Sequence, residues 1–134
     1  GELTDAGTRV PLIANWPGVL TAGELADDIV DFSDWLPTFI ELAGGTAPDG
    51  IDGRSLATRL RGEGAGNRRY AFAEHNGKRT IRTQRWKLYD DGRLFDMALG
   101  RKEENAVLVD QSTVEAHEAR LELARAMRAV NGSD

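Results

Sequence analysis

Few side chains in this 134-residue chain could do chemistry, and the most suggestive are the consecutive Glu74-His75-Asn76. They close the alternating stretch "RRYAFAEH", and Asn76-Gly77 is typical of a tight turn. Binding groups often lie on such loops at the end of a strand. A structural histidine fits the same pattern, and the second histidine, His117, lies among helix-forming residues far along the chain. The segment is therefore open to a binding or a structural interpretation.

The loop "PDGIDG" offers the nearest approach to a metal site. Asp49 and Asp52 carry oxygen ligands for a hard cation, but calcium loops use several acidic ligands at regular spacing. Aspartates beside glycines are more typical of turns. The chain has no cysteine, which excludes disulfides, Cys-ligated zinc and a thiol nucleophile within it. No Ser-His-Asp order and no glycine-rich phosphate loop is found, so the sequence by itself shows no active site.

Positive charge is concentrated in one stretch, although the formal net charge of the chain is −5. Seven lysines and arginines stand against one glutamate between Arg68 and Leu88. This asymmetry indicates either a surface for anions or a solvated basic face of a sheet. The acidity of the whole chain disfavours a nucleic-acid partner. No apolar run approaches the ~20 residues that cross a bilayer, so we expect no membrane partner either.

The elements that must position these residues fall into two parts, 1–66 and 67–134. In the first part, Val10 to Ala14 have the composition of a buried strand. The segment "SDWLPTFIELAGG" predicts a helix that is capped at its start by Asp31 or Ser33. One apolar face of this helix is expected to carry Leu36, Phe39, Ile40 and Ala43. A turn-rich loop and a short helix in "SLATRLRGEG" follow.

The second part predicts a four-stranded antiparallel sheet. One strand covers Tyr70 to His75, and "KRTIRTQRWKLYDDGRLFDM" predicts two hairpins, with turns at Gln84-Arg85 and Asp90-Asp91-Gly92. Ser112-x-x-Glu115 is a capping box that opens a helix running to Val130. The residues of this helix expected to cover one face of the sheet are Leu121, Ala124 and Met127.

Taken in order, these motifs resemble the C-terminal third of a sulfatase of the alkaline-phosphatase-like superfamily. "AGTRVPLIANWPG" resembles the family's Gly-x-Arg-Val-Pro-Leu-Ile strand with its closing Trp-Pro-Gly, and "DFSDWLPTFIELAG" resembles the helix that follows. "PDGIDGRSL" matches the next loop, and "YAFAEH" with "RTIRTQRWKLYDDGRLFDM" resembles the family's C-terminal sheet. The family's continuation, Asp-Pro-x-Glu-x-x-Asn-Leu, is reshaped here, since Gly100-Arg101 replaces Asp-Pro while Glu103 and Asn105 echo the pattern.

The resemblance implies an α/β fold in which Val10–Ala14 and the helix after it are the last strand and helix of a large catalytic domain. A small antiparallel sheet packed by the C-terminal helix would follow. It also implies a parent enzyme that hydrolyses sulfate esters with formylglycine and calcium, whose residues lie upstream of this chain. The family's sulfate-contacting lysine would precede Gly1, and we expect Arg9 to form a structural salt bridge. No catalytic or metal residue is assigned here, and we expect this chain alone to be inactive.

The partners implied by the resemblance are the missing N-terminal catalytic part of the parent and an anionic sulfate-ester substrate. The residues that we expect to reach that substrate are His75, Asn76 and Arg82. Without a sheet to join, the strand Val10–Ala14 would expose apolar side chains and unpaired backbone groups, so we also expect self-association through it. Family members are often exported, but this sequence by itself does not fix a compartment.

Two alternatives stay open. A phosphonate or phosphate ester hydrolase of the same superfamily has a similar C-terminal region, and the upstream nucleophile separates the two enzyme classes. A stand-alone module for sulfated polysaccharide would stack a sugar ring on Trp86 and pair sulfates with Arg82 and Arg85. Binding that depends on these side chains and weakens with salt would favour such a module.

Overall fold

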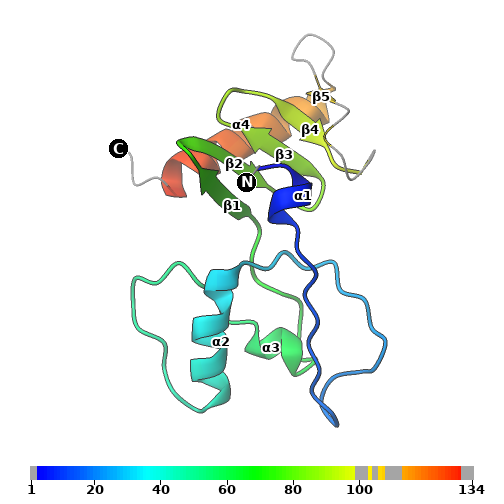
Figure 1. Ribbon diagram of the computed structural model, residues 1–134, viewed down its shortest axis with the longest axis vertical. Coiled ribbons are helices and arrows are strands. Elements are labelled where there is room, and N and C mark those ends of the chain that lie inside the picture. The colour runs from blue at the N-terminus through cyan, green and yellow to red at the C-terminus, as the bar shows by residue number, and fades with distance from the viewer. Residues whose placement is uncertain (1–2, 99–102, 104–105, 108–112, 131–134) are drawn as a thin grey trace. The chain divides into compact units, whose positions relative to one another are not determined.

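The computed structural model describes residues 3–98, 103, 106–107 and 113–130 (Figure 1). The chain divides into two compact units, one formed by Leu12–Arg69 and the other by Gly1–Pro11 together with Tyr70–Asp134. We call them the helical unit and the sheet unit and describe each by itself. They differ from the predicted division at residue 66 because the N-terminal segment belongs with the sheet. The assignment of residues 1–66 and 67–134 to two domains of a longer parent protein stays a prediction.

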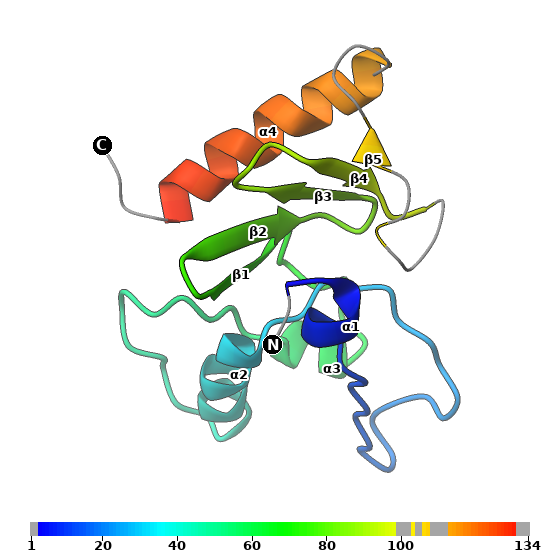
Figure 2. The same ribbon diagram turned by 45° about the horizontal axis from the view of Figure 1, so that its top comes forward.

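The sheet unit is built on an antiparallel sheet in which the five strands formed by the described residues are neighbours in chain order (Figure 2). The strands are β1 (Ala71–His75), β2 (Lys78–Arg82), β3 (Trp86–Tyr89), β4 (Leu94–Asp96) and β5 (Ala106–Val107). Both predicted hairpins are confirmed. The Thr83 N–H donates to the Trp86 carbonyl at 2.8 Å across the first turn, and Gly92, at a φ of 88°, lies in the second. β5 was not predicted because a two-residue strand gives no periodic signal.

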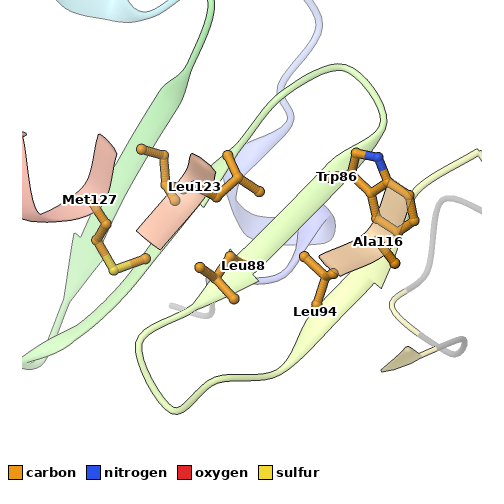
Figure 3. Packing of buried hydrophobic residues seen from close by; sticks show 7 residues of the cluster. Trp86, Leu88, Leu94, Ala116, Leu123 and Met127 are labelled. Carbon is orange, nitrogen blue, oxygen red and sulfur yellow. The ribbon is translucent and has the colours of Figure 1, made fainter. Parts of the chain in front are cut away.

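One face of the sheet is covered by helix α4 (Val114–Val130), as Figure 2 shows. The hydroxyl of Thr113 caps the helix by accepting the Ala116 N–H at 3.3 Å, whereas the predicted cap Ser112 lies outside the described residues. The predicted contact through Leu121 is wrong: this side chain is 45% exposed, because it lies nearly opposite Leu123 around the helix. The buried cluster between helix and sheet, drawn in Figure 3, consists of Ile81, Trp86, Leu88, Leu94, Ala116, Leu123 and Met127.

The N-terminal segment, which contains the single helical turn α1 (Asp5–Thr8), packs against other side chains of the same sheet. Because successive side chains of a strand point to opposite faces, β3 places Trp86 and Leu88 toward α4, and Lys87 and Tyr89 on the other side. A second buried cluster there contains Leu3, Tyr89 and Phe95. All four residues of β3 are therefore buried.

The helical unit contains the 3-10 turn η1 (Phe32–Asp34) and the helices α2 (Trp35–Leu42) and α3 (Ala57–Leu60). The predicted helix is confirmed, and so is its cap. The Asp31 carboxylate accepts the Ser33 N–H at 2.9 Å, and the Asp34 carboxylate accepts the Asp31 N–H at 2.8 Å. This reciprocal arrangement satisfies amide groups that have no partner within the helix.

The buried face of α2 is not the one that its apolar residues predict. Pro37 and Thr38 are buried, whereas Leu36 and Phe39 are 58% and 62% exposed. The Thr38 hydroxyl donates to the Asp34 carbonyl at 2.5 Å and accepts the Leu56 N–H at 2.9 Å. Hydrogen bonds therefore set which face of the helix packs inside this unit.

Residues 10–14 form no strand, contrary to the prediction, because no described segment pairs with them. Ile13 is 88% exposed, and Pro11 has no N–H to donate to a neighbour. A strand needs a partner for its backbone groups, and this part of the chain has none among the described residues. The predicted exposure of apolar side chains in this segment agrees with the structure. The predicted strand is not formed.

Candidate functional site

His75 and Asn76, two of the predicted substrate residues, lie at the tight turn between β1 and β2. Asn76 and Gly77 both have positive φ angles, of 51° and 71°, as this class of hairpin turn requires. Both predicted side chains are exposed, and the Asn76 Nδ2 lies 3.1 Å from the His75 Nε2. The turn thus presents a paired imidazole and amide to solvent.

Arg82, the third predicted residue, lies at the opposite end of the same hairpin. The register pairs His75 with Lys78 and Ala71 with Arg82, so the structure does not bring the three residues together. The Arg82 guanidinium donates to Asp5 Oδ2 at 2.7 Å and to the carbonyls of Thr83 and Gln84. Its charge is thus used inside the sheet unit.

The sugar-binding surface predicted around Trp86 is not built as expected. Trp86 is only 9% exposed and packs in the cluster beneath α4 (Figure 3). The Arg85 guanidinium lies 4.7 Å from the Trp86 ring centroid and pairs with Asp96 at 2.9 Å and Glu115 at 2.5 Å. The tryptophan ring is therefore closed to a sugar, and the neighbouring Arg85 is already paired with carboxylates from other segments.

The loop that carries Asp49 and Asp52 forms turns, with Gly50 at a φ of 78°. The backbone carbonyl of Asp52 accepts a hydrogen bond from Arg68 at 3.0 Å. Within the described ranges, no three His, Cys, Asp or Glu side chains come close enough to hold a metal ion. The resemblance places the calcium ligands upstream of this chain, so we derive no step through that ion.

A buried group of charged residues, which sequence reasoning did not predict, lies in the sheet unit. The Lys87 side chain is 0% exposed, and its ammonium donates to the Leu3 carbonyl at 2.7 Å, Asp5 Oδ1 at 3.0 Å and Glu103 Oε1 at 2.7 Å. The Tyr89 hydroxyl also donates to the Leu3 carbonyl, at 3.1 Å. All three ammonium protons therefore have acceptors.

The electrostatics of this group keep its carboxylates charged. Burial raises the pKa of Asp5, but the hydrogen bond from Lys87 and the charge of Arg82 outweigh it, so the pKa lies below its ordinary value. Burial likewise raises the pKa of Glu103, but the hydrogen bond from Lys87, backbone hydrogen bonds and the charge of Lys87 together outweigh it, so this pKa also lies below its ordinary value. Burial and the neighbouring Glu103 raise the pKa of Tyr89, which keeps its hydroxyl neutral.

Asp34 forms the corresponding buried centre of the helical unit. Its carboxylate is 0% exposed, receives a fork of hydrogen bonds from Arg68, and accepts the Arg54 N–H at 2.8 Å. Burial raises the Asp34 pKa, but the hydrogen bonds from Arg68, Arg54 and Asp31 bring it below the ordinary value. The Asp34 carboxylate thus connects η1 to Arg54, in the loop before α3, and to Arg68, near the end of the unit.

Comparison with known protein families shows to which family this chain belongs. Residues 3–129 match the family described as N-sulphoglucosamine sulphohydrolase, C-terminal. The chain belongs to this sulfatase family.

Curated sulfatases are similar to the chain over part of their length. Human arylsulfatase D is 36% identical over 93 residues, which are 68% of this chain and 16% of that protein. An N-acetylglucosamine-6-O-sulfatase of Bacteroides thetaiotaomicron is 35% identical over 117 residues, 74% of this chain and 21% of that protein. The ulvan-active sulfatase of Formosa agariphila is 31% identical over 80 residues, 60% of this chain and 16% of that protein. The chain thus spans about a fifth or less of these relatives.

Solved sulfatase structures confirm the fold. A protein described as a sulfatase from Bacteroides thetaiotaomicron is 26% identical, with a TM-score of 0.59 over 75% of this chain and 25% of that one. A glycosaminoglycan 2-O-sulfatase is 27% identical, with a TM-score of 0.57 over 72% of this chain and 24% of that one. The fold is therefore that of the C-terminal part of a sulfatase.

In this sulfatase C-terminal region, the two buried centres hold segments together. A carboxylate whose pKa is lowered by cations is a poor proton donor at neutral pH, so Asp5, Glu103 and Asp34 are unsuited to general acid catalysis. The one sequence signal for Lys87 is its position between the apolar Trp86 and Leu88 in a predicted strand. Its partner Asp5, however, lies 82 positions away, which no local pattern reveals.

Proposed function

We propose that this chain is the C-terminal portion of a sulfuric ester hydrolase and that it does not turn over substrate by itself. The observation that carries the proposal is the family match over residues 3–129 to a C-terminal sulfatase region. The short share of each relative that the chain covers, 16% to 21%, supports it. The relatives named above are sulfatases, which favours a sulfate over a phosphate or phosphonate ester as the substrate of the parent.

The nucleophile and metal of the proposed parent belong to its upstream part. Formylglycine forms from a cysteine or serine, and calcium needs several oxygen ligands in one place. These groups would supply the nucleophilic and charge-stabilising chemistry of sulfate-ester cleavage. The residues of this chain would complete the fold around that site.

The surface that we assign to the upstream part is the apolar stripe of η1 and α2, formed by Phe32, Leu36 and Phe39. These side chains follow one another at helical spacing and are 76%, 58% and 62% exposed. Leu12 and Ile13, which belong to the same unit, are 49% and 88% exposed and add further apolar groups. Since the greater part of each sulfatase relative lies outside the matched region, the upstream part of the parent is the occupant that we propose.

His75 and Asn76 are the residues that we propose for contact with the anionic substrate. Their hydrogen-bonding groups are exposed at a tight turn, where they would be accessible to a substrate held by the upstream part. Arg82 stays a weaker candidate, because its guanidinium already donates to Asp5 and to two carbonyls.

The test is reconstitution from two purified pieces, with sulfate release from an aryl sulfate and from a sulfated glucosamine as the readout. We expect no release by the 134-residue chain alone and release when the separately produced upstream part of the parent, with formylglycine and calcium, is added. The double variant Leu36→Ser, Phe39→Ser should weaken reconstitution, while Leu121→Ser, an exposed change on α4, should not. Turnover by the chain alone, or full activity of the upstream part without it, would contradict the proposal.

A further inference from the structure

The N-terminal segment Leu3–Thr8 is attached to the sheet by very few groups. Its helical part is the single turn α1, and residues 6–9 are exposed. Only Leu3 and Asp5 are buried, Leu3 against Tyr89 and Phe95. An isolated helical turn is unstable in water, so the order of this segment must come from its contacts with the sheet.

Those contacts are mostly charged. Asp5 lies between Lys87, at 3.0 Å, and Arg82, at 2.7 Å, while its own N–H donates to Glu103 Oε1 at 2.8 Å. Lys87 also holds the Leu3 carbonyl, and Tyr89 donates to the same oxygen. Among the described residues, Arg93 also faces this cluster, and its guanidinium lies 4.7 Å from the Tyr89 ring centroid.

Lys87 is the side chain that connects these groups. Removing one partner of a buried ion pair leaves the other charge without compensation, which costs far more than the loss of an exposed pair. The sheet itself has a separate source of stability, because the cluster beneath α4 lies on its other face and contains no member of the charged group. Loss of the Lys87 contacts should therefore free the segment before it unfolds the sheet.

We propose that Leu3–Thr8 is a strap, held on the sheet by the charge of Lys87, that opens as a unit while the sheet stays folded. The role of the strap rests on the proposed function. If the chain is the C-terminal part of a longer sulfatase, the upstream polypeptide reaches the sheet unit through this strap. Opening the strap would then let the sheet unit change its position relative to the upstream part without unfolding the sheet, and Lys87 sets how often this happens.

Amide hydrogen exchange of the 134-residue chain at neutral pH tests the strap. The reporting amides are those of Gly7, Thr8 and Arg9, which donate to the carbonyls of Thr4 and Asp5 at 2.9 to 3.0 Å. In Lys87→Met, which keeps a long unbranched side chain, we expect their protection to fall about 100-fold while the amides of β2 and β3 keep theirs. The matched control is Arg79→Met, which removes a cation of β2 that lies 3.7 Å from Asp90 and should leave the strap protected.

A second variant keeps the test decisive if Lys87→Met does not fold. Asp5→Asn removes the charge from the strap alone and leaves Lys87 its contacts with Glu103 and the Leu3 carbonyl, so we expect about a tenfold loss of strap protection. Unchanged strap protection in the folded variants overturns the proposal. So does a parallel loss of protection in strap and sheet. Because no activity is measured, this result is separate from the reconstitution that tests the sulfatase assignment.

Discussion

Arg68 and Lys87 come from the same basic stretch, and each uses its charge inside its own unit. Arg68 donates to the buried Asp34, and Lys87 donates to Asp5 and Glu103. A buried cation is tolerated only when its hydrogen-bonding groups are satisfied, and in both places they are. At the level of single residues, the cations therefore join distant segments, and substituting one partner should have a large effect.

Asp34→Asn should destabilise the helical unit by about 3 kcal/mol, because it leaves the Arg68 guanidinium buried against a neutral partner. Urea unfolding followed by tryptophan fluorescence measures the change, since Trp35 adjoins the substituted residue. The control is Glu41→Gln, whose pair with Arg61 at 3.3 Å is partly exposed and should contribute less than about 0.5 kcal/mol. Equal effects of the two variants would contradict a special role of Asp34.

Gly53→Ala should destabilise the same unit by about 3 kcal/mol or more. A Cβ at this position would lie 2.0 Å from the Ser33 carbonyl oxygen, and both groups belong to backbone that the Asp34 hydrogen bonds hold in place. Thermal unfolding of the variant checks the prediction. Gly64→Ala is the comparison, because its Cβ would meet Thr58 at 3.5 Å, an ordinary contact, and should change stability by less than about 1 kcal/mol.

At the scale of elements, the helices α2 and α4 differ in which face the chain itself covers. In α4, the face with Ala116, Leu123 and Met127 packs on the sheet. In α2, hydrogen bonds of Thr38 determine the packed face, and Leu36 and Phe39 stay exposed. The apolar face of α4 is covered within this chain. We propose that the exposed apolar face of α2 is covered by the upstream part of the parent.

Leu123→Ala should reduce the stability of the sheet unit by about 3 kcal/mol, because the side chain is 0% exposed and the sheet beneath it can collapse only partly into the space. Chemical denaturation with circular dichroism gives the free energy of unfolding. Leu121→Ala, on the same helix but 45% exposed, should cost less than about 1 kcal/mol. A similar loss in both variants would mean that the helix packs in another register.

For the whole molecule, the paired carboxylates predict how stability depends on pH. For Asp5, Asp34, Asp96 and Glu103, burial raises the pKa, but hydrogen bonds to each carboxylate and the charges of the neighbouring lysine and arginines together outweigh it, so each pKa lies below its ordinary value of 3.8 or 4.5. The folded chain then binds fewer protons than the unfolded chain at acidic pH. The stabilisation is complete above those ordinary values and is lost as the pH falls through the lowered ones.

We therefore expect the free energy of unfolding to be flat from about pH 7 to 5 and to fall steeply below about pH 4. Denaturant titrations across this range measure it. Asp34→Asn should show a shallower fall, since one of the protonated groups is gone. An acid dependence identical to that of the unchanged chain would show that the Asp34 carboxylate does not contribute.

In the part of the chain that the structure describes, no helix has the length and apolar character to cross a bilayer. Most of the large exposed apolar side chains of the described residues lie between residues 10 and 39, and the others, Val114, Leu121 and Val130, lie on α4. Among the described residues, this concentration between residues 10 and 39 supports the partner that we propose, the upstream part of the parent.

The sequence by itself determined what depends on neighbours along the chain. The Asn76-Gly77 and Gly92 turns, the Asp31 cap and the helix near the C-terminus follow from backbone preferences that act over a few residues. The order of the motifs also placed the chain among the sulfatases, as the family match confirmed.

Only the tertiary structure decided which side chains are buried and which charges meet. Alternation in β3 could not show that both faces are covered, because the second cover comes from Leu3 and Asp5, more than 80 positions away. The same long-range contacts bury Lys87, and packing beneath α4 buries Trp86. The missing strand at residues 10–14 has the same physical reason, since a strand exists only where another segment satisfies its backbone hydrogen bonds.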